Sequence, residues 1–490
     1  MKITALSALT VTSCIVMGSG SSDQFTLQQK KEVPNIILIQ VDQMRPDHLG
    51  VKTPALMELA SQGVRFVHAY TASPVCQPSR TSIITGMYPS QTGICGNQSN
   101  PVNEELRNAS FMNRLQDAGY YTALIGKHHY IDRYAVGIDV VKEDADAIKA
   151  YGIDFLVQCL DVGEHIPNAD KTENIDDYIY YLRSKGLEKK YFDEVKSGLK
   201  TRKHPLNPDD SEDGFIGQEA VKFVRNFKGN QPFYMNVSFI GPHPPYMVPG
   251  EFHTLPENTR PPVEAVPSPE TARKRAVYED MCTNIDNYVA LLVKALKEKG
   301  LFEKTVILFV ADHGDNLGDY GIWDKRYFYE QSAGVPMFIS GKAITGTNLR
   351  YEAVVSKALV STLDIYPTVL SLAGIDSPVN ERPGRNLIEI INNDNPLFFR
   401  DAVFSELGTC SMIRTAGWKM VFDPEQGGTV YLFNLVVDPG EINNLAGVAG
   451  YENITAELTG KLLSHYITLN QFTHSKEQMR LQKVRVRYNN

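Results

Sequence analysis

The chain has 490 residues and carries 49 Lys and Arg against 57 Asp and Glu, which gives a formal net charge of −8 and a pI near 5.8. This acidic balance excludes a general nucleic-acid-binding surface, which requires a basic face. With 42% apolar and 22% charged residues, the composition is that of a folded globular protein. The length exceeds what one hydrophobic core usually holds, so we expect a large domain and a smaller one.

The first 22 residues have the character of an export signal. Lys2 precedes an apolar stretch, residues 3–11, and small and polar residues follow. The run Val-Thr-Ser-Cys that ends at Cys14 also resembles the lipobox of bacterial lipoproteins, so cleavage and lipid attachment both stay open. No later stretch of the sequence approaches the ~18 consecutive apolar residues of a membrane span. We therefore expect export in a bacterium, to the periplasm or to an outer-membrane tether at the N-terminus.

Four continuous apolar runs each lead to a polar residue. The runs are residues 36–39, 122–125, 237–240 and 306–310, and the polar residues are Asp42, Lys127, His243 and Asp312. Apolar runs without alternation are typical of strands buried on both faces of a parallel sheet. Helical patterns lie between them, at residues 54–62, 111–118 and 271–299. Because ligands bind at the carboxyl ends of the strands in such sheets, we expect the four polar residues to share one crevice.

Two further segments complete the predicted architecture. Residues 132–232 are charged and poorly patterned, and they resemble an insertion over the carboxyl edge of the sheet. Short strand-like pieces and a closing helix, residues 454–466, follow residue 384. The predicted fold is α/β, with a mostly parallel central sheet flanked by helices in residues 33–383. A smaller C-terminal α+β domain is predicted in residues 384–490.

The most specific segment is Cys76-Gln77-Pro78-Ser79-Arg80, followed by Thr85-Gly86. Cys76 stands just before a predicted helix, where amide donors and the helix dipole favour an anion. Arg80, one turn later, can reach back towards it. Taken alone, such a pair is more often a buried thiol and a surface cation. The six cysteines are too scattered for a disulfide framework or a Cys-x-x-Cys metal site.

This run matches the C-x-P-S-R-x4-T-G signature of type I sulfatases at every fixed position, so the chain resembles that family of the alkaline phosphatase superfamily. In the family a maturing enzyme oxidises the cysteine to formylglycine, whose hydrated aldehyde supplies the nucleophilic oxygen. Further motifs occur in the family's order over most of the chain. They are Asp42-Gln43, Gly126-Lys127-His128-His129, Gly241-Pro242-His243-Pro244, Asp312-His313-Gly314 and Lys325. The resemblance implies an alkaline-phosphatase-like fold.

The resemblance also implies a role for each catalytic candidate. Cys76 becomes the nucleophile, and Arg80 holds its oxygen. Lys127 and Lys325 bind sulfate oxygens. The two histidines act on protons, His129 at the diol and His243 at the departing alcohol. Singly, each residue is as well explained as a surface cation or a loop histidine, but the shared order with the cysteine motif favours the catalytic interpretation.

The metal candidates are Asp42, Gln43, Asp312 and His313, with an oxygen of residue 76 as a further ligand. An oxygen-rich set of this kind suits Ca²⁺ or Mg²⁺ better than zinc, and we favour calcium. Many family members have a second Asp where Gln43 stands and an Asn where His313 stands. We therefore expect less negative charge at this site and weaker metal binding.

The predicted activity is hydrolysis of a sulfate ester on a carbohydrate, with the sulfated carbohydrate and the maturing enzyme as partners. One alternative is a formylglycine-dependent phosphodiesterase or phosphonate monoester hydrolase, whose chemistry at residue 76 is the same. A non-catalytic carbohydrate-binding protein is the alternative from another class, but its cysteine motif would be broken. A cysteine-independent alkaline phosphatase would have Ser or Thr at residue 76. The sequence does not identify the sugar or the position of the sulfate.

Overall fold

Strand β1 (Asn35–Val41) lies inside an eight-stranded sheet because it is apolar along most of its length and buried throughout. Strands β5 (Phe233–Ser238) and β6 (Thr305–Ala311) pair with it on either side, both in parallel. Leu38 stands opposite Asn236 on one side and Leu308 on the other. The strand order of the sheet is β4-β3-β5-β1-β6-β7-β2-β8.

The remaining strands of this sheet are β2 (Gly63–Tyr70), β3 (Tyr121–Gly126), β4 (Phe155–Gln158), β7 (Met337–Ser340) and β8 (Val354–Ser361). Strand β7 runs antiparallel to β6 and β2, and the other pairs are parallel. The predicted mostly parallel sheet is therefore confirmed. The run predicted at residues 237–240 is offset, since its strand ends at Ser238. The polar residue Asn236 directly precedes that run and hid the first half of the strand, and Ser238 ends the strand within the run.

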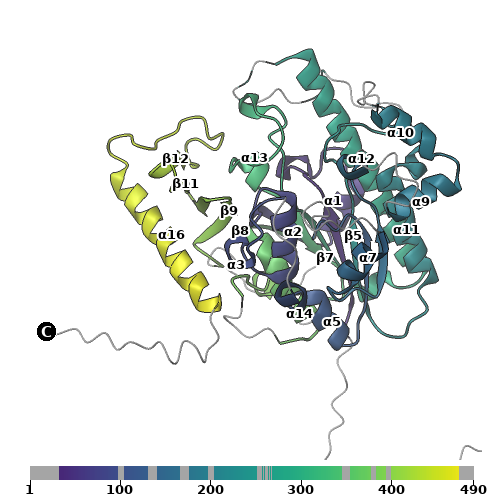
Figure 1. The fold of residues 1–490 in the computed structure, drawn as a ribbon. Helices are drawn as coiled ribbons and strands as arrows, with labels where there is room; N and C mark the ends of the chain where they lie inside the picture. Colours follow the sequence, from purple (N-terminus) through teal and green to yellow (C-terminus); the bar gives the residue numbers. More distant parts are fainter. Residues whose placement is uncertain are drawn as a thin grey trace, which may run out of the picture. The chain divides into compact units, whose positions relative to one another are not determined.

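Helices cover both faces of the sheet (Figure 1). Helices α1 (Pro54–Ala60), α11 (Glu212–Asn226) and α12 (Pro269–Glu298) pack together on one face. Helices α2 (Cys76–Thr85), α5 (Phe111–Asp117) and α14 (Ile365–Leu372) pack together on the other. The three helices predicted from the sequence are among them.

The segment at residues 132–232 is more than the predicted insertion, because it supplies β4 to the sheet and α11 to one of its faces. Its other helices are α7 (Val141–Lys149), α8 (Val162–His165), α9 (Asp177–Ser184) and α10 (Glu188–Lys196). The shorter helices elsewhere are α3 (Pro89–Thr92), α4 (Glu104–Asn108), α13 (Glu330–Ala333) and α15 (Ile388–Asn392). Single 3-10 turns occur at Pro46–His48, Pro208–Asp210, Phe302–Lys304, Asp319–Gly321 and Thr362–Asp364.

The computed structural model describes residues 33–97, 104–130, 141–165, 176–196, 203–250, 257, 259, 263, 265, 267–344, 354–376, 382–392 and 399–473. The predicted leader, residues 1–22, lies outside these ranges. Residues Val33–Asn490 belong to one structural unit, and the domain boundary near residue 384 stays a prediction. None of the helices in the described ranges combines the length and the apolarity that a membrane crossing needs.

A second sheet of four antiparallel strands is built from β9 (Ala402–Leu407), β10 (Cys410–Thr415), β11 (Trp418–Asp423) and β12 (Gly428–Asn434). Side chains alternate between its faces. The cross-strand pair Ile413 and Met420 packs against helix α16 (Glu452–Thr473), while the pair Met412 and Val421 packs towards the first sheet. This α+β layout agrees with the predicted C-terminal architecture.

A buried lysine joins the second sheet to the rest of the chain. Lys419 on β11 is fully buried, and its Nζ lies 2.7 Å from Glu330 Oε1 and 2.6 Å from Glu441 Oε1. The same Nζ donates a hydrogen bond to the carbonyl oxygen of Phe328 at 2.8 Å. One buried carboxylate, one partly exposed carboxylate and one carbonyl thus compensate the desolvation of a single ammonium group.

We predict that Lys419→Met lowers the free energy of unfolding by about 3–5 kcal/mol, because it leaves the buried carboxylate of Glu441 without its cation. Urea unfolding at neutral pH measures the effect. The matched control is Lys189→Met, since Lys189 is 87% exposed and pairs with Asp193 on the surface of α10. The control should change the free energy by less than about 1 kcal/mol. Equal effects of the two variants would contradict a supporting role for Lys419.

Candidate active site

The carboxyl ends of four neighbouring strands, β3, β5, β1 and β6, form the floor of the candidate site. Backbone hydrogen bonds continue the pairing just beyond the strands. The amide of Asp42 donates to the Gly241 carbonyl at 3.2 Å, and the amide of Lys127 donates to the Ser238 carbonyl at 3.0 Å. The structure therefore brings the four polar strand ends together, while the chemical roles assigned to them stay predictions.

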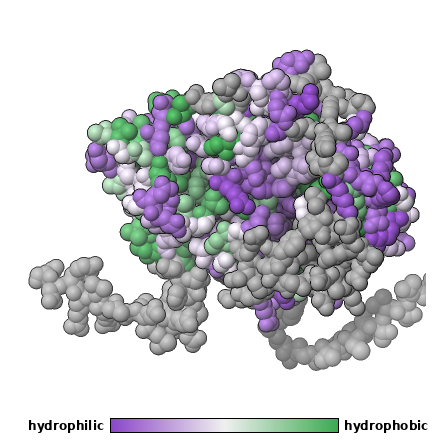
Figure 2. All heavy atoms as spheres, turned by 45° about the horizontal axis from the view of Figure 1, so that its top comes forward, coloured by the Kyte–Doolittle hydropathy of each residue, from purple (hydrophilic) through white to green (hydrophobic). Residues whose placement is uncertain are grey.

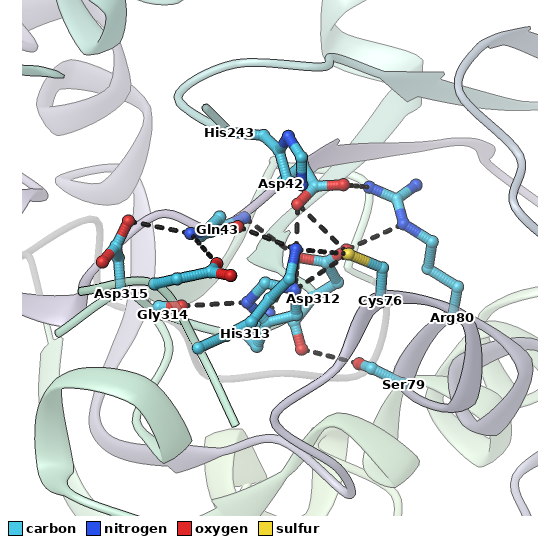
Figure 3. Close-up of polar contacts among 12 residues, drawn as sticks. Asp42, Gln43, Cys76, Ser79, Arg80, His243, Asp312, His313, Gly314 and Asp315 are labelled. Carbon is cyan, nitrogen blue, oxygen red and sulfur yellow. Dashed lines mark hydrogen bonds and ion pairs between the residues drawn. The ribbon is translucent and has the colours of Figure 1, made fainter. Parts of the chain in front are cut away.

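Cys76 is the first residue of α2 and is buried, with 1% of its surface exposed. Figure 3 shows its sulfur pointing into a group of charged side chains. The Sγ atom lies 3.0 Å from Lys325 Nζ, 3.1 Å from His313 Nε2 and 3.6 Å from Asp42 Oδ1. A thiol in these surroundings differs from an inert core cysteine such as Cys282, whose pKa burial raises well above the ordinary value.

The electrostatics around Cys76 favour an anion at this position. Burial raises the pKa of the Cys76 thiol, but the charges of Lys325, His313 and Lys127 and a hydrogen bond with His129 outweigh burial. The pKa of the thiol therefore lies well below its ordinary value. The same fields would stabilise negative charge on an oxygen placed here.

Arg80 connects the helix of Cys76 to the strand ends. Its guanidinium Nε lies 2.8 Å from Asp312 Oδ2, and Nη2 lies 3.1 Å from Asp42 Oδ2 (Figure 3). Its Nη1 donates to the Lys127 carbonyl at 3.0 Å and to Ser238 Oγ at 2.8 Å. Burial lowers the pKa of Arg80, but Asp312 and Asp42 raise it further, so the group stays charged.

Four side chains form a candidate metal-binding group. One ligand atom from each of Asp42, Cys76, Asp312 and His313 lies within 4.8 Å of all the others, and all four residues are buried. Burial and Cys76 raise the pKa of Asp42, but Lys127, His243 and Arg80 lower it further, so this carboxyl is ionised. Two carboxylates, one imidazole and residue 76 thus surround a common point.

Because Nδ1 of His313 is hydrogen-bonded to the backbone, Nε2 is the ring nitrogen that can bind a ligand. His313 Nδ1 contacts the Gly314 carbonyl oxygen at 2.9 Å, so Nδ1 carries the proton there. The Nε2 atom faces Asp42 Oδ1 at 3.8 Å and Asp312 Oδ1 at 3.6 Å. Burial lowers the pKa of His313, but Asp312 and Cys76 raise it to about 9. This point therefore favours a cation, and a neutral His313 could bind a metal through Nε2.

Gln43 is held in a fixed orientation by two carboxylates. Its Nε2 donates to Asp315 Oδ2 and to Asp324 Oδ1, both at 2.8 Å. Only the nitrogen of a side-chain amide can donate to two carboxylates, so these contacts identify the nitrogen and therefore also the oxygen. The Oε1 atom faces inward and accepts from Lys325 Nζ at 2.8 Å. Gln43 is thus able to offer an oxygen towards Cys76, although its backbone φ of 69° is unusual for a residue other than glycine.

Lys127 is buried between two carboxylates. Its Nζ lies 2.8 Å from Asp42 Oδ2 and 2.7 Å from Asp161 Oδ2. Burial lowers the pKa of Lys127, but Asp161 and Asp42 raise it well above the ordinary value. The lysine therefore stays protonated and fixed in place, as a residue that contacts an anionic group requires.

The two catalytic candidates among the histidines lie at the edge of this group. His129 is partly buried, and its hydrogen bond to Cys76 helps to lower the thiol pKa. His243 is also partly buried, and its Nδ1 lies 2.6 Å from the Pro244 carbonyl oxygen. With Nδ1 occupied, Nε2 is the atom with which His243 can exchange a proton with a substrate. His128, by contrast, is buried and contacts Gln158.

The chain matches two models of known protein families. Residues 34–375 match the family model described as Sulfatase, and residues 318–467 match the model described as N-sulphoglucosamine sulphohydrolase, C-terminal. The chain belongs to the type I sulfatase family. This confirms the resemblance seen in the sequence motifs, and with it the alkaline phosphatase superfamily and hydrolysis of a sulfate ester as the activity.

Relatives of this sulfatase match most of its length. A choline-sulfatase of Rhizobium meliloti is 30% identical over 460 residues, which cover 84% of this chain and 82% of the relative. An ulvan-active sulfatase of Formosa agariphila is 28% identical, with 94% and 87% covered. The phosphonate monoester hydrolase of Agrobacterium radiobacter has a similar structure, with a TM-score of 0.72, 22% identity and coverage of 90% and 96%. At that identity the structural likeness supports the α/β fold alone.

Several residues of the sulfatase site were not predicted from its sequence. They are Asp161, Ser238, Tyr246, Asp315 and Asp324. The first follows β4, a strand of four residues, three of them half-buried, that gave no clear apolar run. Two others, Asp315 and Asp324, lie close in sequence to Asp312 and Lys325. Their closeness to these predicted residues could have identified them from the sequence.

Proposed function

We propose that this sulfatase removes sulfate from a carbohydrate and uses formylglycine at residue 76 as its nucleophile. The observation that carries the proposal is the setting of Cys76, a complete recognition motif at the start of α2 with Sγ in contact with Lys325 and His313. The match of residues 318–467 to the C-terminal model of an N-sulphoglucosamine sulphohydrolase supports a sugar as the alcohol, as does the ulvan-active relative.

The proposed reaction has two steps at residue 76. In the first, one hydroxyl of the aldehyde hydrate gives its proton to solvent, its oxygen attacks sulfur, and the bond between sulfur and the sugar oxygen breaks. Lys127 and Lys325 neutralise charge on the sulfate oxygens, and His243 gives a proton to the departing sugar oxygen. In the second, the remaining hydroxyl of residue 76 loses its proton to His129, sulfate departs, and the aldehyde forms again. Water then restores the hydrate.

The residues present fit a divalent cation, and we propose calcium, with magnesium as the alternative. Asp42, Gln43, Asp312 and His313 would hold the ion together with residue 76. When bound, it would polarise a sulfate oxygen and favour ionisation of the hydrate. Carboxylate and amide oxygens suit the hard cations, and an imidazole among them is unusual. With only two carboxylates in the set, we expect weaker binding than in relatives that have a third.

Phosphonate monoester hydrolysis is the rival activity. The setting of residue 76 serves both reactions, because both transfer a tetrahedral anionic group to the same oxygen. Only a direct comparison of substrates separates them.

We further propose that the chain is exported in a bacterium and matured by a formylglycine-generating enzyme. The leader-like residues 1–22 support export, with Cys14 as the candidate for lipid attachment, and the complete motif after Cys76 supports recognition by the maturing enzyme. Periplasmic release and an outer-membrane tether both agree with this leader.

The first prediction from this proposal is that Cys76 is found as formylglycine after expression with a maturing enzyme. Peptide mass spectrometry should show the aldehyde, and the matured protein should hydrolyse 4-nitrophenyl sulfate faster than a 4-nitrophenyl phosphonate monoester. Cys76→Ala should lose turnover while its thermal unfolding stays cooperative. Full activity of a protein that carries only the thiol would overturn the mechanism, and faster phosphonate turnover would favour the rival activity.

The second prediction concerns the cation. Chelation should abolish turnover, and added calcium should restore turnover and raise the unfolding temperature, because the ion binds the folded state alone. Gln43→Leu removes the oxygen that faces Lys325 and should weaken calcium affinity by about 10-fold or more. Calorimetric titration of the demetallated protein measures the affinity. Unchanged calcium binding in Gln43→Leu would remove Gln43 from the set of ligands.

The third prediction tests His243 as the general acid. A sugar alkoxide needs a proton when it departs, whereas a nitrophenolate needs it far less. His243→Ala should therefore lose more activity on a sugar sulfate than on 4-nitrophenyl sulfate, by a factor on the order of 10²–10⁴ in kcat/KM. Equal losses on the two substrates would make His243 a sulfate-binding residue and pass the acid role to another group such as Lys325.

A further inference from the structure

An aromatic hollow lies directly beside the segment that carries Lys325, and its volume is about 160 Å³. One wall is formed by residues 326–329, which follow Lys325 in the chain, and the other by the second sheet. The rings that line it are Tyr327, Phe328, Tyr329, Tyr431 and Phe433. Nothing in the proposed reaction at residue 76 uses this hollow.

The backbone fixes the hollow relative to the nucleophile. Asp324 and Arg326 both have positive φ, 69° and 76°, on either side of Lys325. Lys325 is buried with its Nζ 3.0 Å from Cys76 Sγ, whereas Arg326 is exposed and lines the hollow. The amide of Arg326 also donates to the carbonyl of Pro74 at 3.2 Å, two residues before Cys76. Lys325 thus contacts the reacting group, while the adjacent Arg326 lies at the hollow beside it.

The aromatic rings of the hollow are open to solvent at its rim. Tyr327 is 39% exposed and Tyr431 is 38% exposed, which is high for residues that usually bury their rings. Tyr329 links them, with ring centroids 6.4 Å from Tyr327 and 6.1 Å from Tyr431. Figure 2 shows hydrophobic side chains gathered over the C-terminal part of the molecule and hydrophilic ones over the centre. Exposed rings of this kind offer a flat apolar surface to the face of a sugar ring.

Polar groups complete the lining. Asp423 and Gln426 face the hollow from the second sheet and hydrogen-bond to each other at 2.7 Å, so they can exchange that bond for one to a hydroxyl group. Among the described residues, the guanidinium group of Arg326 has no ion-pair or hydrogen-bond partner. An unpaired guanidinium is suited to bidentate binding of a sulfate or carboxylate group.

We propose that this hollow is a second sugar subsite. It binds the unit next to the one whose sulfate is removed, with that unit's ring against Tyr327 and Tyr431 and its anionic group, a sulfate or a carboxylate, paired with Arg326. The proposal rests on the proposed carbohydrate substrate and narrows it to chains in which an anionic sugar neighbours the target sugar. It also makes the second sheet a part of substrate recognition.

The test compares two substrates of the matured enzyme. One is the anionic disaccharide sulfate that the wild-type protein hydrolyses fastest in a panel, and the other is 4-nitrophenyl sulfate, which has no second sugar unit. Arg326→Gln and Tyr431→Ala should each raise KM for the disaccharide about 10-fold, leave kcat nearly unchanged, and leave both constants for the aryl sulfate unchanged. Arg326→Lys keeps the charge but not the bidentate contact, so it should recover only part of the affinity that Arg326→Gln loses.

Matched controls come from elsewhere on the surface. Arg225→Gln changes an arginine whose side chain is 58% exposed, and Tyr180→Ala changes a tyrosine that is 60% exposed. Neither should alter KM for either substrate. Equal losses on both substrates, or no loss on the disaccharide, would overturn the subsite while leaving the sulfatase proposal standing. Turnover of the aryl sulfate alone by the wild-type protein would overturn the carbohydrate substrate and the subsite together.

Discussion

The buried guanidinium of Arg80 is the contact on which the site depends. From one side chain on α2 it reaches Asp42 after β1, Asp312 after β6, the Lys127 carbonyl after β3 and Ser238 at the end of β5. A buried guanidinium is costly unless its donors are satisfied, and here acceptors at the ends of four strands satisfy four of its five N–H donors. The same contacts fix the start of α2, and therefore residue 76, against the carboxyl ends of the sheet.

Three carboxylates and three cationic side chains, Arg80 included, lie in the site, and the two kinds of charge occupy different places. Asp42, Asp161 and Asp312 face Arg80, Lys127 and Lys325, and the cations lie around residue 76 on the side where an anion would bind. The other oxygen of each of the Asp42 and Asp312 carboxylates, Oδ1, faces His313 Nε2. This separation lets one small volume hold a cation and an anionic ester side by side, which charge stabilisation in the transition state requires.

The sequence predicted the centre of this arrangement better than its edges. Strands β1, β3 and β6 were visible because burial on both faces makes them continuously apolar, and the residues after them were predicted to meet for the same reason. Strand β8 was missed because its first half is partly exposed, and the bulged strand β2 mixes Arg65 and His68 with apolar residues. Contacts such as Gln43 with Asp324 join residues that are 281 positions apart, so only the folded chain shows them.

The second sheet and the loop that follows β12 do more than support helix α16, because they determine where the segment after Lys325 lies. Lys419 binds the Phe328 carbonyl, the Glu330 amide donates to Glu441, and Tyr320 donates to the Gly440 carbonyl. These contacts hold both ends of residues 320–330, the stretch that carries Lys325 inward and Arg326 outward. A sheet that positions one cation of the reaction and one wall of the hollow links substrate recognition to catalysis. Changes in its loops can therefore alter which sugar is bound without altering the chemistry at residue 76.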